Sequence, residues 1–275
     1  MKNTTKAPLP FAGQKRNWIK PLKEILSKLP SDTVFVDVFG GSGLVAHLCK
    51  ELHPTARVVY NDYDNYSERL AHIQETEELR LMLLDAFKDV ERLKRINDRE
   101  KLCAIVQSHK EKYKYVDWIT LSSWVLFTNR FVRSVDDLHK EGLWKCVSRT
   151  ALSAETAERW LQGLEIVSFD WKEVVDRYKN SPNVLFIFDP PYLATVCKGY
   201  SKQDWGIAEY KELLALMPKE RFLYFSSRKM DYIPLLNTLV PHWGGKSPFL
   251  EAKIFERSST CGANTENPEI LYYKL

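Results

Sequence analysis

Long apolar runs and an export signal are both missing from this 275-residue sequence. A membrane-spanning helix needs roughly 18 or more consecutive apolar residues, and no segment approaches that length. Residues 1–11 have neither the apolar stretch nor the small-residue cleavage site of a signal peptide. We therefore expect a cytoplasmic protein that does not bind a membrane.

Cysteine and histidine are present, but not in patterns that carry chemistry. The five cysteines lack any C-x-x-C spacing, which argues against a disulfide framework and against a zinc knuckle. The six histidines do not cluster with acidic residues at the spacing of metal ligands. The sequence therefore predicts no metal site.

An excess of one charge is also nearly absent. Forty Lys and Arg against 36 Asp and Glu leave a net charge of +4, which is too small by itself to indicate a polyanionic partner. The excess is uneven, because residues 88–149 hold 14 basic and 9 acidic side chains. The content of 44% hydrophobic and 28% charged residues is that of a folded protein. The length allows one large domain or a core with an insertion.

Short apolar, β-branched runs alternate with helix-like segments over much of the chain. The strand-like runs are 34–38, 57–60, 164–169, 184–188, 221–227, 251–256 and 269–275, and helices are expected at 44–52, from Trp171 and from Ile207. This alternation predicts an α/β fold with a doubly wound, mostly parallel sheet. The last two strands read as an antiparallel pair at the edge of that sheet.

The middle of the chain has a different pattern. Residues 64–129 are mostly helical and charged, with no Gly or Pro from Gln74 through Asp117. Residues 131–149 mix basic side chains with Trp144 and lack clean periodicity. We interpret residues 88–162 as an inserted, mainly helical region, with residues 1–87 and 163–275 forming the α/β domain.

Three of the 11 glycines fall within four positions, directly after the first strand. Gly40, Gly41 and Gly43 allow a sharp turn and the close approach of a ligand to the backbone. Gly41, Gly43 and Ala46 alone also fit the dinucleotide pattern G-x-G-x-x-A, with Asp62 some 21 positions after Gly41. A carboxylate after the second strand suits any ligand with a ribose, because it accepts from both hydroxyls. The turn therefore predicts a cofactor site but leaves the cofactor open.

A second group, Asp189, Pro190, Pro191 and Tyr192, follows the uninterrupted strand 184–188. A parallel strand delivers such residues to the carboxyl edge of the sheet, where open α/β sheets bind ligands. The two prolines hold the backbone extended. Asp189 and the Pro190 carbonyl could accept both hydrogens of an amine on a planar ring, which aims the nitrogen lone pair at an electrophile, while Tyr192 stacks on the ring.

These motifs, in this order, resemble the Dam-like, alpha-group DNA N6-adenine methyltransferases. Residues 11–15 (FAGQK) resemble the family's W-x-G-G-K block, residues 37–43 (DVFGGSG) resemble its glycine block, and residues 189–192 match D-P-P-Y without change. Weaker similarities are Asp62, the Phe169–Asp170 pair and the closing NPEILYY. The resemblance implies a class I methyltransferase-like fold that moves a methyl group from S-adenosylmethionine to the N6 amine of a flipped adenine in duplex DNA.

The family's site residues carry over as implications. Asp189, Pro190 and Tyr192 would be catalytic. The cofactor would contact Phe11, Gly13, Lys15, Asp37, Phe39, Gly40, Gly41, Gly43, Asp62, Phe169, Asp170 and Asp189. Among these, Asp62 would take the ribose and Asp170 the adenine of the cofactor. Because the sulfonium is already a good leaving group, alignment suffices, and an Asp189 of ordinary low pKa can serve as the acceptor.

The inserted region would then recognise the target in DNA. Its basic excess, with Asn129, Arg130 and Arg133, fits contacts to phosphates and grooves, and Lys198 and Lys202 beyond the catalytic loop could hold the DNA backbone. Turning an adenine out of the duplex costs a few kcal/mol. The chain departs from the family's usual F-N-G-L-[YW]-R, running NRFVRSVDDLHKEG instead, so a GATC target gains no support. A cognate restriction nuclease as partner and a monomeric state are further expectations.

Three other functions compete with this hypothesis. The acceptor could be another planar amine, such as cytosine N4, an RNA adenine or a glutamine amide; those enzymes usually have Ser or Asn where this chain has Asp189. A nicotinamide-dependent oxidoreductase would explain the glycine pattern but not D-P-P-Y. A non-catalytic DNA-binding protein would not need the intact catalytic residues.

Overall fold

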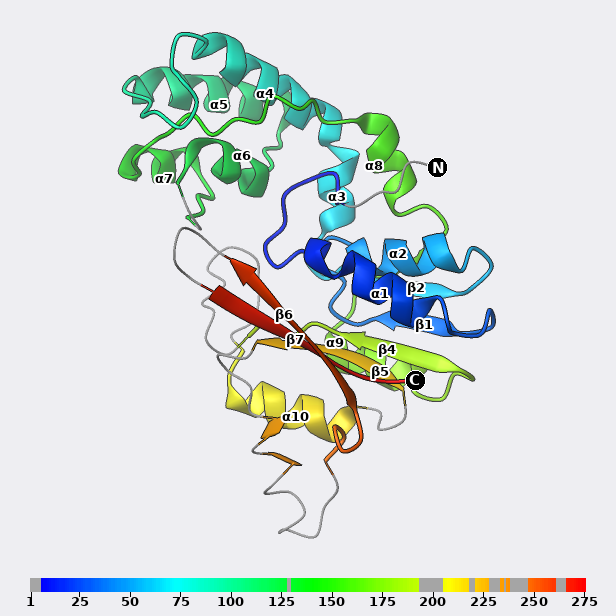
Figure 1. Ribbon diagram of the computed structural model, residues 1–275. Helices are drawn as coiled ribbons and strands as arrows, with labels where there is room; N and C mark the ends of the chain where they lie inside the picture. Colours follow the sequence, from blue (N-terminus) through cyan, green and yellow to red (C-terminus); the bar gives the residue numbers. More distant parts are fainter. Residues whose placement is uncertain are drawn as a thin grey trace.

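The computed structural model describes residues 6–127, 130–192, 205–217, 221–227, 233–234, 236–237, 247–260 and 266–275. Its centre is a seven-stranded sheet in the order β3-β2-β1-β4-β5-β7-β6 (Figure 1). The strands are β1 (Val34–Asp37), β2 (Val58–Asn61), β3 (Glu165–Val167), β4 (Val184–Phe188), β5 (Phe222–Ser227), β6 (Lys253–Thr260) and β7 (Glu266–Lys274).

The strands pair as the sequence predicts. Those from β3 through β5 are parallel, whereas β7 is antiparallel to both β5 and β6. β2 is buried along its length, and β4 is buried after Val184, as near-continuous apolar strands of a covered parallel sheet should be. The doubly wound, mostly parallel sheet with its antiparallel edge pair is therefore confirmed.

The third strand is shorter than the expected run over 164–169. The backbone N–H of Phe169 donates to Asn61 Oδ1, and the Phe169 carbonyl accepts from Asn61 Nδ2, each at 3.0 Å. Because a side chain satisfies both backbone groups, they do not continue the strand ladder. Asn61 thus turns the chain away from the sheet, at its carboxyl edge.

Helices cover both faces of the sheet (Figure 1). One core contains side chains of α1 (Ile19–Leu26) and α2 (Leu44–Leu52), and the opposite core contains side chains of α9 (Trp171–Tyr178) and α10 (Ile207–Leu216). The expected helices at 44–52, from Trp171 and from Ile207 are all present. A short 3₁₀ turn, η1 (Arg16–Trp18), precedes α1.

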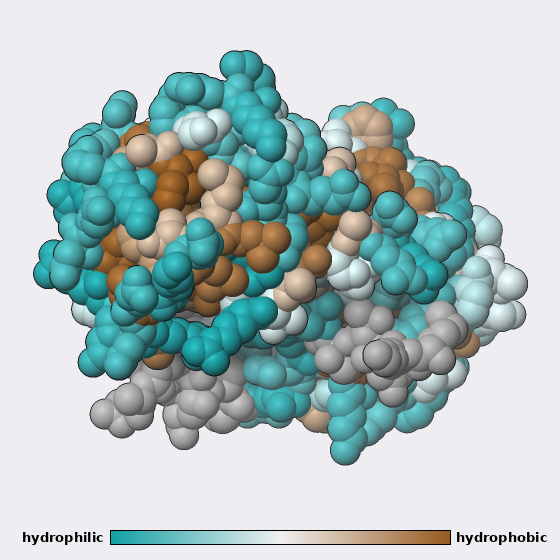
Figure 2. All heavy atoms as spheres, turned by 90° about the horizontal axis from the view of Figure 1, so that it is seen from above, coloured by the Kyte–Doolittle hydropathy of each residue, from teal (hydrophilic) through white to brown (hydrophobic). Residues whose placement is uncertain are grey.

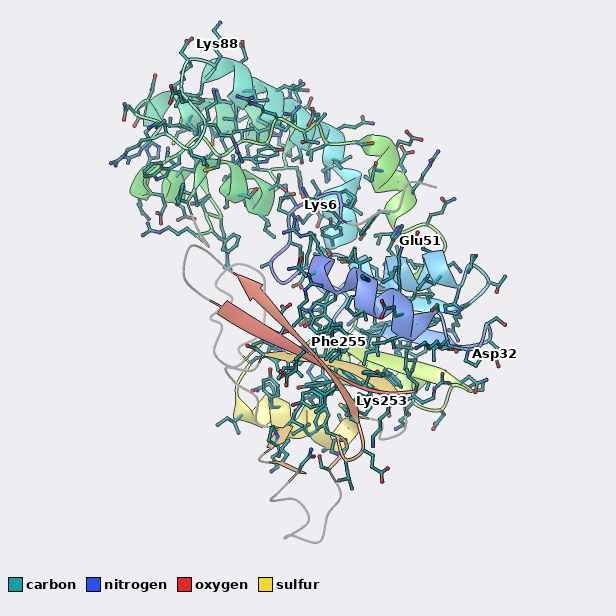
Figure 3. All side chains as sticks on the ribbon, viewed as in Figure 1. Lys6, Asp32, Glu51, Lys88, Lys253 and Phe255 are labelled. Atoms are coloured by element: carbon teal, nitrogen blue, oxygen red, sulfur yellow. The ribbon has the colours of Figure 1, made fainter. Side chains whose placement is uncertain are left out.

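The remaining helices extend from the α1–α2 side of the sheet to one end of the molecule, where most of them form a separate helical layer (Figure 1). They are α3 (Tyr66–Ala71), α4 (Ile73–Ala86), α5 (Arg99–Tyr113), α6 (Trp118–Val125), α7 (Val135–Lys140) and α8 (Ala154–Trp160). A third hydrophobic core lies among α4 to α7, and Lys88 marks its distal end (Figure 3). Seen from this end, hydrophobic atoms are surrounded by hydrophilic ones (Figure 2).

The cores divide the chain near, but not at, the expected limits of the insertion. Leu79 and Leu83 of α4 already belong to the helical core, whereas Trp160 of α8 packs in the core beside α1 and α2. The limits 88 and 162 therefore stay a prediction. Within the described part of the chain, no helix is long and apolar enough to cross a bilayer.

Candidate active site

The site lies where β1 and β4 end. Asp37 closes β1, and its register partner on β4 is Ile187. Asp189 is two residues beyond Ile187, so the two carboxylates project to the same side of neighbouring strands. Asp37 is buried, with 2% of its surface exposed. The first turn and the Asp-Pro-Pro-Tyr loop therefore converge at one edge of the sheet, as the sequence predicts.

The glycine turn needs glycine for steric reasons at two positions. A Cβ on Gly40 would lie 2.3 Å from the Tyr60 ring, and a Cβ on Gly41 would lie 2.9 Å from the Phe11 ring. Gly41 also has a φ of +50°, a left-handed value that disfavours other residues. Phe11 of the N-terminal block, residues 11–15, therefore lies against the glycine turn, which brings together two motifs that are 30 residues apart.

Lys15 joins the N-terminal block to the Asp-Pro-Pro-Tyr loop. Its Nζ lies 2.5 Å from Asp189 Oδ2 and donates to the Gly13 carbonyl at 3.0 Å. The Lys15 side chain is only 5% exposed, and Nζ lies 5.6 Å from the centre of the Tyr192 ring. A buried ammonium of this kind needs its carboxylate partner, since an unpaired charge there would be costly. Lys15, Asp189 and Tyr192 therefore form one unit.

Burial sets the ionisation of the two carboxylates. Burial, followed by the charge of Asp189, raises the pKa of Asp37 to about 7. Burial also raises the pKa of Asp189, against the opposing effect of Lys15. An aspartate of ordinary low pKa would suffice as the acceptor, and the raised pKa of Asp189 follows from the desolvation of a carboxylate at the sheet edge.

The tyrosine of the Asp-Pro-Pro-Tyr loop is held as a neutral donor. Its hydroxyl lies 3.5 Å from Asp189 Oδ1, and burial raises the Tyr192 pKa well above its usual value. The loop is also fixed from the other face of the sheet, where the Tyr210 hydroxyl donates to the Pro191 carbonyl at 2.6 Å. The side chain of Pro190 is buried.

Asp62 and Asp170 both accept hydrogen bonds from N–H groups at the start of a helix. Asp62 Oδ1 accepts from the Tyr66 N–H at 2.6 Å and from the Tyr60 hydroxyl at 3.0 Å, and its Oδ2 accepts from the Ser67 N–H at 2.9 Å. Asp170 accepts from the Lys172 N–H at the start of α9. Each carboxylate still has further lone pairs, so both roles at a cofactor stay predictions.

Aromatic rings line the edge beside these acids. Phe39, directly after β1, stacks on Trp171 with ring centres 6.4 Å apart and meets Trp205 edge-on at 5.3 Å. Phe169 carries the Arg177 guanidinium over its ring at 4.1 Å. The predicted cofactor residues Phe39 and Phe169 thus follow β1 and β3, at the same edge of the sheet.

Several residues that support the site were not predicted. The Tyr60 hydroxyl shares its single hydrogen between Asp62 and the Gly41 carbonyl, whose oxygen lies 2.8 Å away, and Trp160 Nε1 donates to the Ser42 carbonyl at 2.7 Å. Asn61 fixes Phe169 and also donates to the Val38 carbonyl. Among these supporting residues, only Asn61 gave a sequence signal, as part of the polar pair Asn61–Asp62 at the end of β2, whereas Trp160 is 118 residues from its hydrogen-bond partner.

The expected DNA-contacting residues are only partly described. Arg130 and Arg133 are exposed, and Arg130 pairs with Glu141 at 2.6 Å. Both lie in the segment between α6 and α7, the two helices on the side of the helical layer that faces the sheet (Figure 1). Asn129, Lys198 and Lys202 lie outside the described residues. Within the described residues, no group of three potential metal ligands is present.

The strand order, the glycine turn after β1 and the Asp-Pro-Pro-Tyr loop after β4 define a class I methyltransferase fold. The family model of the D12 class N6 adenine-specific DNA methyltransferases matches residues 11–134. A protein of Haemophilus influenzae (strain ATCC 51907 / DSM 11121 / KW20 / Rd), described as "Putative methyltransferase", is 35% identical over 241 residues, covering 86% of this chain and 80% of the relative. The chain belongs to the D12 class N6 adenine-specific DNA methyltransferases, and it is an adenine methyltransferase.

Proposed function

We propose that this enzyme transfers the methyl group of S-adenosylmethionine to the N6 amine of an adenine that is turned out of duplex DNA. The observation that supports this most directly is the Lys15–Asp189–Tyr192 unit beside the glycine turn. It joins a hydrogen-bond acceptor and an aromatic face to the place where a cofactor can approach the backbone. These are the parts that methylation of a flat amine requires.

The chain's residues fit this cofactor. A Cβ on Gly40 or Gly41 would clash with the Tyr60 or Phe11 ring, so the glycines keep the turn packed closely against these rings, and the buried Asp37 carboxylate suits a ligand with positive charge. Phe11, Gly13 and Lys15 would hold the cofactor from the N-terminal side, and Phe39, Gly43, Asp62, Phe169 and Asp170 from the ends of β1, β2 and β3. When bound, S-adenosylmethionine supplies an electrophilic methyl carbon on a sulfonium.

The Asp-Pro-Pro-Tyr loop would orient the amine. Asp189 and the Pro190 carbonyl each accept one N–H, so that the nitrogen lone pair points out of the ring plane, and Tyr192 stacks on the base. The nitrogen becomes positive as its bond to carbon forms and the sulfur–carbon bond breaks. A carboxylate at that position stabilises the developing charge, and Asp189 would receive the proton that the nitrogen then loses.

Duplex DNA would lie between the helical layer and the sheet. Arg130 and Arg133, which are both exposed, would contact phosphates, and the same role is proposed for Asn129, Lys198 and Lys202. Extrusion of the adenine costs a few kcal/mol, and stacking on Tyr192 can return about 1–3 kcal/mol. A cognate nuclease, a monomeric state and a cytoplasmic location stay predictions that accompany this proposal.

The direct test uses S-adenosylmethionine labelled in its methyl group and unmethylated duplex DNA. We expect label in N6-methyladenine, identified after digestion to nucleosides. Label in N4-methylcytosine, in RNA or in protein would instead assign the enzyme to another planar amine. Sequencing of methylated DNA from cells that express the protein would report the target sequence.

Asp189→Asn tests the proposed catalytic role. The change keeps the size of the side chain but removes the charge and turns one oxygen into a donor, so we expect kcat to fall by about 10²-fold or more. Cofactor affinity, measured by calorimetry, should stay within several-fold of wild type. The matched control is Asp176→Asn on α9, where the carboxylate is 73% exposed. Near-normal turnover of the Asp189 variant would refute the role.

A further inference from the structure

Two side chains of one short turn reach toward two different carboxylates. Within η1, the Trp18 N–H donates to the Lys15 carbonyl at 2.9 Å. Lys15 pairs with Asp189, and Trp18 Nε1 donates to Glu269 Oε2 at 2.7 Å. Phe225 lies against both side chains, with its ring centre 5.2 Å from Lys15 Nζ and 5.5 Å from the Trp18 ring. The turn is therefore clamped at two points.

The register of the sheet places Glu269 at the catalytic edge. On β5, Tyr224 lies opposite Phe188 of β4, the residue before Asp189. Glu269 of β7 lies opposite Ser227, three residues farther toward the carboxyl end of β5. Side chains alternate along a strand, so Glu269 shares a face with Leu271, which belongs to the core beneath α1 and α2. This is the face on which Trp18 lies.

Trp18 is itself enclosed by the sheet. It is fully buried and meets Phe255 of β6 at 5.8 Å, in addition to Phe225 of β5. Phe255 is labelled on β6 in Figure 3. Both aromatic neighbours come from the antiparallel side of the sheet, so Glu269 fixes the polar end of a side chain whose position is otherwise set by packing. The clamp thus ties the N-terminal block to strands more than 200 residues away.

The indole donor does not cancel the charge of Glu269. Among the residues that the structure describes, no lysine or arginine forms an ion pair with Glu269, and its register neighbour on β6, Arg257, donates instead to the Asn17 carbonyl at 2.5 Å. Burial is the main reason that the pKa values of Asp189 and Tyr192 are raised, and the charge of Glu269 adds to both shifts. The described groups that act on Asp189 are Lys15 from the N-terminal segment, Asp37 from β1, Tyr192 from its own loop and Glu269 from β7.

We propose that Glu269 is a positioning residue of the active site, which holds Trp18 so that Lys15 lies on Asp189 and which adds a second negative charge to the pocket. This proposal rests on the proposed function only for its catalytic consequence. The clamp and the electrostatic effect are properties of the chain alone. Both can be measured without cofactor or DNA.

The test is the titration of Asp189, followed by NMR of protein labelled with ¹³C at the aspartate carboxyl carbon and assigned with Asp189→Asn. Glu269→Gln removes the charge but retains an oxygen that can accept from Trp18. We expect the Asp189 pKa to fall by about 0.5–1, because a nearby negative charge is lost. Glu256→Gln on β6, an exposed residue, is the control and should leave this pKa unchanged.

Trp18→Phe has the opposite expected effect. It removes the donor but keeps the Glu269 charge, so Lys15 loses its fixed position and the Asp189 pKa should rise. If Glu269 had only a structural role, Glu269→Gln would lower the melting temperature without moving the Asp189 titration, and that result would overturn the proposal. If the Trp18→Phe variant does not fold, the titration of Asp189 in Glu269→Gln alone decides the proposal.

Activity measurements separate this proposal from the proposed function. In Glu269→Gln we expect the acidic limb of the kcat profile to shift to lower pH, and in Trp18→Phe we expect KM for S-adenosylmethionine to rise several-fold with a smaller change in kcat. If wild type methylates DNA but Asp189 does not respond to Glu269→Gln, the positioning role fails alone. If Asp189 responds but wild type transfers no methyl group to DNA, the proposed function fails alone.

Discussion

Ionisation of Asp37 lowers the stability of the folded protein. Its pKa is raised to about 7, first by burial and then by Asp189, whereas an unfolded aspartate titrates near its ordinary value. The folded state therefore binds the proton more tightly, and the resulting stabilisation is complete below about pH 4 and is lost as the pH rises through about 7. A pKa that differs by one between the folded and unfolded states corresponds to about 1.4 kcal/mol.

Asp37→Asn should remove this pH dependence. In urea unfolding between pH 4.5 and 8.5, the free energy of unfolding of wild type should fall toward neutral pH. The free energy of unfolding of the variant should therefore increase relative to that of wild type as the pH rises. The asparagine remains uncharged at every pH, so only groups common to both proteins contribute to its own slope. Parallel curves for the two proteins would contradict the raised pKa of Asp37.

At the scale of elements, the turn between β1 and α2 depends on the absence of a side chain at Gly40. Gly40→Ala would place its Cβ 2.3 Å from the Tyr60 ring and 2.8 Å from the Asn61 carbonyl. Since neither a buried ring nor a backbone atom can yield easily, we expect a loss of about 1–3 kcal/mol in the free energy of unfolding. We also expect weaker cofactor binding.

The matched control for that change is Gly142→Ala in the helical layer. There the nearest atom to the new Cβ is 3.8 Å away, an ordinary contact. The stability of this variant should stay within about 1 kcal/mol of wild type. Thermal unfolding and calorimetric titration with S-adenosylmethionine report both quantities, and equal effects of the two substitutions would contradict the steric argument.

The sequence predicted these elements because their causes are local. Apolar runs predicted the strands, the glycines predicted the turn after β1, and the Asp-Pro-Pro-Tyr motif predicted the loop after β4. The supporting residues act through distant contacts that leave no local pattern. Trp160 reaches a carbonyl 118 residues away, and Trp18 and Glu269 are 251 residues apart. The raised pKa of Asp189 likewise follows from burial, which only the assembled sheet creates.

At the scale of the whole molecule, basic side chains in different parts of the helical layer should contribute differently to DNA binding. Arg133 is exposed two residues before α7, whereas Lys88 lies at the distal end of the layer (Figure 3). Loss of one phosphate contact reduces the slope of log K against the logarithm of the salt concentration by about one. We expect Arg133→Ala to show this reduction in fluorescence anisotropy and Lys88→Ala to bind DNA as wild type does.

One buried ion pair joins the helical layer to the segment that leads into the N-terminal block. Arg69 of α3 contacts Asp117, the residue before α6, with Nε 3.1 Å from both carboxylate oxygens, and it donates to the Pro10 carbonyl at 2.8 Å. The two side chains are 7% and 1% exposed. Asp117 also caps α6 through the Thr120 N–H. Arg69 is thus a shared partner of both regions.

Removal of either charge should therefore do more than destabilise one helix. Arg69→Met leaves the Asp117 charge without its main partner, which we expect to cost about 3–5 kcal/mol, whereas Asp117→Asn keeps the helix cap and should cost less. The double variant Arg69→Met, Asp117→Asn should be more stable than Arg69→Met alone, because no unpaired buried charge remains. Hydrogen exchange should show faster opening of both α6 and residues 9–11 in the single Arg69 variant. Faster exchange in α6 alone would show that the pair stabilises the helical layer without linking it to the N-terminal block.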